Sequence, residues 1–262
     1  GVLRFVDMLR GDVMTFDPRT AALDRTHVAD VVAALRPRER GGWVVAVEHG
    51  FALTEPGAWA IGSVVEAFAD PAVRMNDGGC DAAGGFLCGS MAYDQRPGAA
   101  SLYRLAPDGT VAVVLEGVTI SNGFCLDPSG SLAYYVDTPT GRIDVFDVGA
   151  DGQTLAARRP FVEIEAGAGW PDGLTVDAEG AVWVALHGGG TVRRYTAAGA
   201  LDTVVTVATP HVTSCAFGGD QFRDLFITTS QERIDTTRDP LAGALFHAAP
   251  GPRGLAPRGF AG

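Results

Sequence analysis

Three oxygen-bearing side chains recur at one register of the sequence. Asn76, Asn122 and Asp172 each stand ten residues before a short run of β-branched or aromatic residues. The chain holds only two Asn residues, and both fall at this register. Amide and carboxylate oxygens suit hard divalent cations, with calcium, magnesium and manganese as the leading candidates. The pattern therefore predicts an oxygen-rich metal site.

A structural explanation competes with this one. Asn122 and Asp172 are each followed by Gly, and both dipeptides are common turn formers, so either residue alone is explained without chemistry. All three residues at one register favour the metal site. The same count places Ala33 and Cys215 before two further runs, and Cys215 is interpreted as an inert buried thiol. The five His residues form no paired motif typical of a softer metal.

The runs that follow these residues are a repeat. Six occur at a spacing near 45 residues, starting at Leu3, Trp43, Phe86, Leu132, Val182 and Leu225. In most repeats a second amphipathic run follows the first, and this pattern is typical of a meander of short strands. This period predicts one all-β domain over residues 1–262, a six-bladed β-propeller. Innermost strands surround the channel of a propeller, so residues at one repeat position form a ring.

Turn residues support the same repeat. Gly stands two residues before five of the runs, and three of these glycines close an Asp-x-x-Gly turn that begins at Asp81, Asp127 or Asp177. Gly1 is the turn glycine of the first repeat, whose ring position falls upstream of it. We therefore expect the innermost strand of the first blade upstream of residue 1. Residues 59–68 have a weak helical period, but Gly62 and the flanking Pro residues favour strand and loop.

Composition excludes several classes of partner and chemistry. The net charge of −11 argues against nucleic-acid and anionic-membrane partners. All 20 basic residues are Arg, which excludes lysine Schiff-base chemistry and a P-loop. No apolar run approaches the length of a membrane helix, and the four scattered Cys residues indicate reduced thiols in a cytoplasmic protein. A closed propeller needs no partner to complete its core, so a monomer is expected.

Motifs in these repeats match a known family. Residues 74–91 contain R-x-N-D-G, and S-N-G and P-D-G follow in order around Asn122 and Asp172. With these motifs the sequence resembles the senescence marker protein, regucalcin and gluconolactonase family of six-bladed propellers. The resemblance implies a divalent metal on the channel axis, held by Asn122, Asp172 and a Glu expected upstream of residue 1. It also implies substrate contacts from Arg74 and Asn76, and Asp172 as general base.

The function expected from this resemblance is that of a lactonase-type carboxylic ester hydrolase. The metal, calcium first with magnesium, manganese, zinc or iron as alternatives, polarises the carbonyl of a sugar lactone as a Lewis acid. Asp172 takes a proton from the attacking water. Arg74 orients sugar hydroxyls, or else pairs with a local acid such as Asp77. Two alternatives stay open: hydrolysis of another activated ester such as a phosphotriester, and a propeller that binds metal or small molecules without turnover.

Overall fold

The apolar runs of the sequence form antiparallel β-strands, with no α-helix between them. The computed structural model describes residues 1–262 and contains 22 strands in six antiparallel sheets, together with two single-turn 3-10 helices. Neither helix is long and apolar enough to cross a membrane. The all-β prediction is confirmed.

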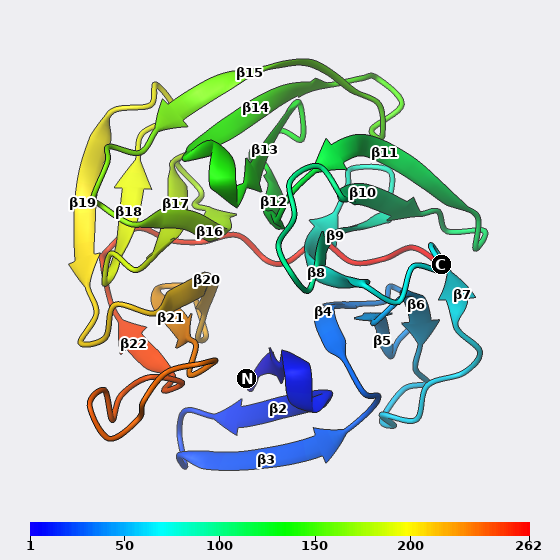
Figure 1. Ribbon diagram of the computed structural model, residues 1–262, viewed down its shortest axis with the longest axis horizontal. Helices are drawn as coiled ribbons and strands as arrows, with labels where there is room; N and C mark the ends of the chain where they lie inside the picture. Colours follow the sequence, from blue (N-terminus) through cyan, green and yellow to red (C-terminus); the bar gives the residue numbers. More distant parts are fainter. The chain divides into compact units, whose positions relative to one another are not determined.

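The strands group into two compact units of three sheets each, and Figure 1 labels most of the strands. Unit 1 comprises residues 1–121, 150–154 and 257–262, and unit 2 comprises residues 122–149 and 155–256. A single domain over 1–262 stays a prediction.

Unit 1 holds the first three sheets. The first contains β1 (Leu3–Asp7), β2 (Asp12–Asp17) and β3 (Ala22–His27), with the 3-10 helix η1 (Met8–Arg10) between β1 and β2. The second contains β4 (Val32–Pro37), β5 (Trp43–Val47), β6 (Gly50–Leu53) and β7 (Val65–Glu66). The third contains β8 (Val73–Cys80), β9 (Phe86–Ala92), β10 (Ala100–Leu105) and β11 (Val111–Val118).

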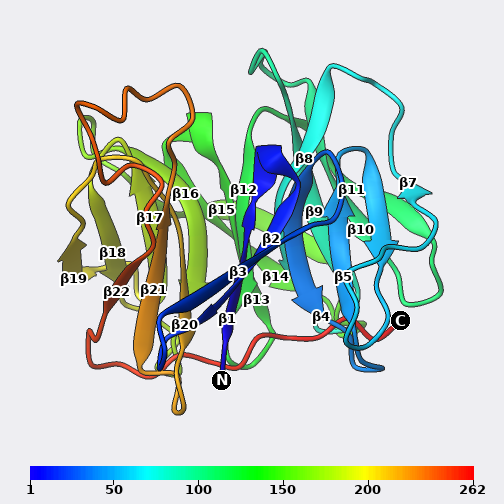
Figure 2. The ribbon, with the colours of Figure 1, turned by 90° about the horizontal axis from the view of Figure 1, so that it is seen from below.

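Unit 2 holds the other three sheets. The fourth contains β12 (Ser121–Leu126), β13 (Leu132–Asp137), β14 (Arg142–Val148) and β15 (Leu155–Glu163), with the 3-10 helix η2 (Thr138–Thr140) after β13. The fifth contains β16 (Trp170–Val176), β17 (Val182–His187), β18 (Thr191–Tyr195) and β19 (Leu201–Thr206). The sixth contains β20 (Val212–Gly218), β21 (Asp224–Thr229) and β22 (Phe246–Ala248), which lie side by side in Figure 2.

The predicted repeat coincides with these strands. Five of the six runs begin at the first residue of a strand. The sixth run begins at Leu225, one residue after the start of its strand β21 at Asp224. In every sheet but the first the run is the second strand. In the three-stranded first sheet it is β1, which pairs with β2 alone. Residues 59–68 are loop and strand, as predicted, and include β7 and a bridge between Thr54 and Ile61.

The turn glycines adopt the backbone that their role requires. Gly84, Gly130 and Gly180 have φ values of 76°, 76° and 83°, a region that side chains with a Cβ rarely adopt. The N–H of each donates to the carbonyl of the Asp three residues earlier. Asp177 also accepts two backbone N–H groups of its turn with its own carboxylate, at 2.9 and 3.0 Å. The Asp-x-x-Gly turns are thus locally encoded and fix where each second strand begins.

Apolar side chains from neighbouring sheets form the core within each unit. In unit 1 the rings of Phe51 and Phe86 meet edge to face at 5.8 Å. In unit 2 the rings of Trp183 and Phe217 do the same at 5.5 Å. Burial of such a side chain stabilises the fold by about 1.5–3 kcal/mol. The strand aromatics therefore pack between neighbouring sheets.

Candidate active site in the first strands of the sheets

The register that the sequence singled out lies inside strands. Its five residues are Ala33 in β4, Asn76 in β8, Asn122 in β12, Asp172 in β16 and Cys215 in β20. The explanation of Asn122 and Asp172 as turn formers is therefore wrong. Pairing with the second strand shifts beside four of these positions, in β4, β8, β16 and β20. Such β-bulges re-aim side chains and are frequent next to active sites.

In unit 1, Arg74 and Asn76 form one hydrogen-bonded pair. Both are buried, with 6% and 7% of their surfaces exposed. Nη1 of Arg74 donates to Oδ1 of Asn76 at 2.7 Å, and Nδ2 of Asn76 donates to the carbonyl of Ser121 at 2.7 Å. A carbonyl only accepts hydrogen bonds, so the orientation of this amide is fixed. Oδ1 of Asn76 therefore faces the guanidinium.

Arg74 is held by further contacts. Its Nη1 also donates to the carbonyl of Met75 and lies 3.0 Å from the sulfur of Met8 in η1. The guanidinium carbon lies 5.8 Å from the centroid of the Tyr93 ring, within the range of a cation–π contact. These contacts fix the position of the buried guanidinium, whose planar N–H groups are donors only.

Asp77 follows Asn76 at the bulge of β8. Burial raises the pKa of its carboxyl, while the charge of Arg36 and the N–H of Gly78, which donates at 2.7 Å, act in the opposite direction. Loss of water therefore outweighs the nearby cation at this carboxyl.

In unit 2, a hydroxyl fixes the amide of Asn122. Nδ2 of Asn122 donates to Oγ1 of Thr138 at 2.6 Å, and this hydroxyl donates its proton to the carbonyl of Pro171 at 2.8 Å. Because the single hydroxyl proton is used on Pro171, Thr138 must accept from the NH₂ group of Asn122. The carbonyl oxygen of Asn122 is therefore the atom suited to a cation.

The same chain of hydrogen bonds connects Asn122 with the strand of Asp172. Pro171 directly precedes Asp172, which is partly exposed at the bulge of β16. A Cβ at Gly123 would lie 3.0 Å from the carbonyl oxygen of Asp172, and one at Gly173 would collide with Ser214. These glycines are required by close packing of the first strands, so Asn122 and Asp172 are presented by a tightly packed layer.

Other candidate groups have structural surroundings. Cys215 is 4% exposed, and its Sγ lies 3.7 Å from the carbonyl of Trp183, in keeping with an inert thiol. His187 pairs with Trp170 in the β16–β17 ladder, and its ring centroid lies 5.7 Å from that of His211. Burial, and next the neighbouring His211, lower the pKa of His187.

The donor set fits a hard cation better than a soft one. No cluster of three or more His, Cys, Asp or Glu side chains with metal-binding geometry occurs in residues 1–262. The two candidate donors are the carbonyl of Asn122 and the carboxylate of Asp172, and both are oxygen donors. The sequence singled out these two residues as metal ligands, which stays a prediction, but it did not single out Thr138 or Tyr93. Neither has a local signature, because each acts through a partner far away in the sequence.

Comparison with known proteins assigns the family. The family model described as "SMP-30/Gluconolactonase/LRE-like region" matches residues 1–231. The chain belongs to this family. Regucalcin of Danio rerio is 32% identical over 99% of this chain and 90% of its own length. A Bacillus subtilis protein named "Putative sugar lactone lactonase YvrE" is 31% identical over 100% of this chain and 91% of its own.

Solved structures of this family have the predicted architecture. The crystal structure of a calcium-binding protein, regucalcin, from Agrobacterium tumefaciens matches with a TM-score of 0.93 at 24% identity. The match covers 99% of this chain and 90% of that one. The six antiparallel sheets are the blades of a six-bladed β-propeller, as the repeat predicts.

Proposed function

We propose that this chain is a metal-dependent lactonase that opens a sugar lactone by hydrolysis. The observation that carries the proposal is the pair of hydrogen bonds that runs from Asn122 through Thr138 to the carbonyl of Pro171. These bonds fix which atom of the Asn122 amide is the oxygen, and they tie Asn122 to the strand of Asp172. Membership of a gluconolactonase-containing family, and likeness to a relative named as a sugar lactone lactonase, support this reaction class.

The metal would be held by Oδ1 of Asn122 and the carboxylate of Asp172. When bound, a divalent cation supplies Lewis-acid polarisation of the lactone carbonyl. We propose calcium, because calcium accepts oxygen ligands in flexible geometries that two protein donors and waters can complete. Magnesium, manganese, zinc and iron are the alternatives that the experiment below compares.

The remaining roles fall to this chain's own side chains. Asp172 accepts a proton from the attacking water while the oxygen of that water bonds to the lactone carbonyl carbon. The ring C–O bond then breaks, and the proton passes to the departing ring oxygen, which leaves a hydroxy acid. Arg74 donates to oxygens of the sugar or to the developing negative charge. Asn76 holds Arg74 in place and offers its NH₂ face to the carbonyl of Ser121.

The experiment compares substrates and metals on the wild-type protein. Hydrolysis of glucono-1,5-lactone is followed by titration of released acid, corrected for spontaneous opening, after chelation and after addition of each metal. We expect loss of turnover on chelation and recovery with calcium. An aryl phosphotriester measured in parallel tests the second ester class. Turnover of the phosphotriester alone, or lactone turnover unaffected by chelation, would overturn the proposal.

A further inference from the structure

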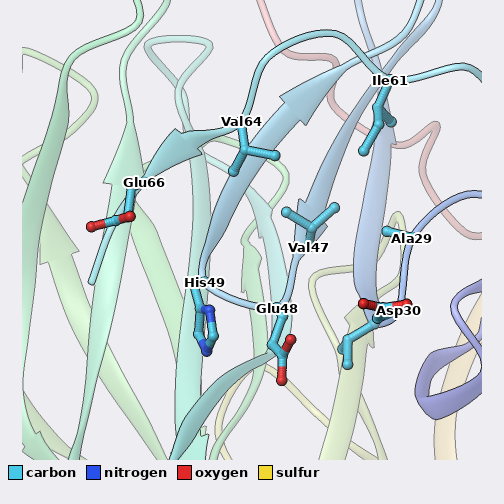
Figure 3. A pocket seen from close by; sticks show the side chains of 9 residues that line it. Ala29, Asp30, Val47, Glu48, His49, Ile61, Val64 and Glu66 are labelled. Carbon is cyan, nitrogen blue, oxygen red and sulfur yellow. The ribbon is translucent and has the colours of Figure 1, made fainter. Parts of the chain in front are cut away.

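A cavity of about 300 Å³ lies in unit 1 at the turn between β5 and β6. Glu48 and His49 of this turn line it, together with residues 29–31 and the segment that leads into β7. Figure 3 shows the apolar side chains Val47, Val64 and Ile61 towards one end and the polar side chains of Asp30, Glu48 and His49 towards the other. The cavity therefore has an apolar wall and a polar floor.

The polar floor is linked to Arg74 through Tyr93. The hydroxyl of Tyr93 donates to Oε1 of Glu48, and the ring of Tyr93 lies under the Arg74 guanidinium at 5.8 Å. The backbone is tied as well, because the N–H of Met75 donates to the carbonyl of Glu48 at 2.8 Å. Burial, and then the hydrogen bond to Glu48, raise the pKa of Tyr93 to about 12, so the phenol keeps its proton and the link persists at working pH. One carboxylate thus faces the cavity and also supports Arg74.

The charge of the lining sets which groups can enter. Asp30, Glu48 and Glu66 contribute three carboxylates, and no Arg lines the cavity. Carboxylate oxygens accept hydrogen bonds from hydroxyl groups but repel phosphate and carboxylate groups. His49 also lines the cavity, and its Nε2 is buried without a hydrogen-bond partner.

We infer that this cavity is a substrate subsite that takes the uncharged, hydroxyl-bearing side chain of a sugar lactone and rejects its anionic counterparts. The inference rests on the proposed function, since Arg74 is the lactone contact from which the subsite extends. Carbon–hydrogen faces of the side chain pack on Val47 and Val64, while its hydroxyls donate to the carboxylates of Glu48 and Asp30.

The test compares glucono-1,5-lactone with its 6-phosphate. We expect the wild-type protein to favour the neutral lactone in kcat/KM. Glu48→Gln removes one charge but keeps an acceptor for Tyr93, and Asp30→Asn combined with Glu66→Gln removes two charges from exposed positions. Each removed charge should lower the preference about fivefold at low salt, the size of one screened like-charge contact. Glu116→Gln, on the outer strand β11, changes the net charge equally and should leave the preference unchanged.

A binding measurement separates this inference from the proposed function. Calorimetric titration with glucitol and with glucitol 6-phosphate reports discrimination without turnover. Discrimination that falls in the cavity variants but not in Glu116→Gln supports the subsite even if no lactone is hydrolysed, in which case the proposed function alone fails. Lactone hydrolysis with equal preference in the wild type, the cavity variants and the control would overturn the subsite alone.

Discussion

Asn76 and Asn122 are the same residue at the same register of two sheets, and each donates through Nδ2, yet the groups that hold the two amides differ. The carbonyl of Asn76 accepts from the guanidinium of Arg74, and its NH₂ group donates to a backbone carbonyl. The NH₂ group of Asn122 donates to the hydroxyl of Thr138, which itself donates to the carbonyl of Pro171. Identical register therefore specifies position, whereas the neighbouring hydrogen bonds specify chemistry. On this difference we propose that Asn76 serves substrate binding and Asn122 the metal.

The largest effect is expected from the acid that accompanies Asn122. Asp172→Asn keeps the volume and one oxygen ligand but removes the negative charge and the proton acceptor. Lactone turnover at saturating metal should fall about 10²–10⁴-fold, the usual contribution of a general base. Thermal unfolding should stay near that of the wild type because Asp172 is partly exposed. Full turnover of this variant would remove Asp172 as the base.

A pair of alanine variants tests the contrast between the two amides directly. Asn122→Ala should weaken metal binding about 10–100-fold, with the rate largely restored by excess metal. Asn76→Ala should lower kcat/KM through Arg74 while leaving the metal affinity unchanged. Rates across a metal titration measure both. Rescue of both variants by metal, or of neither, would abolish the contrast.

Thr138 is expected to act on the metal only through Asn122. Thr138→Val keeps the shape of the side chain but removes the hydroxyl that anchors Nδ2, so metal affinity should fall about tenfold. Thr138→Ser retains the hydroxyl and should stay near the wild type. Metal titration by calorimetry checks both variants. Equal affinities for Val and Ser would show that the anchor is not needed.

The smallest effect concerns stability and pH. The pKa of His187 is lowered in the folded chain, so the unfolded chain binds a proton at a higher pH than the folded one. This contribution to stability is present above the unfolded pKa of about 6.5 and is lost as pH falls below it. The urea midpoint should therefore decline between pH 7 and 5, and less steeply in His187→Gln. Parallel slopes would contradict the assignment to His187.

Local signals explain why most of the architecture was predictable. β-branched runs and Asp-x-x-Gly turns act within a few residues, and both Gly84 and Gly180 adopt the left-handed backbone expected of them. The register of Asn76, Asn122 and Asp172 follows from the same repeat. Family membership confirms the six-bladed propeller, while the roles of these residues stay predictions.

Other parts of the site could not be read from the sequence. The Asn-Gly and Asp-Gly dipeptides at 122 and 172 have the composition of turns, but both lie within strands whose close packing requires the glycines. Tyr93 and Glu48 are 45 residues apart in the sequence, and Thr138 and Pro171, which are also hydrogen-bonded, are 33 residues apart. Contacts between strands of different sheets depend on the assembled fold. The orientation of each amide is therefore visible only in three dimensions.

Anomalous diffraction from crystals soaked in manganese tests the central claim most directly. Manganese accepts the same oxygen donors and is located without assumptions about the ligands. We predict a peak at bonding distance from both Oδ1 of Asn122 and the carboxylate of Asp172, with Thr138 still anchoring Nδ2. A metal bound elsewhere, or none at these two oxygens at saturating manganese, would contradict the account.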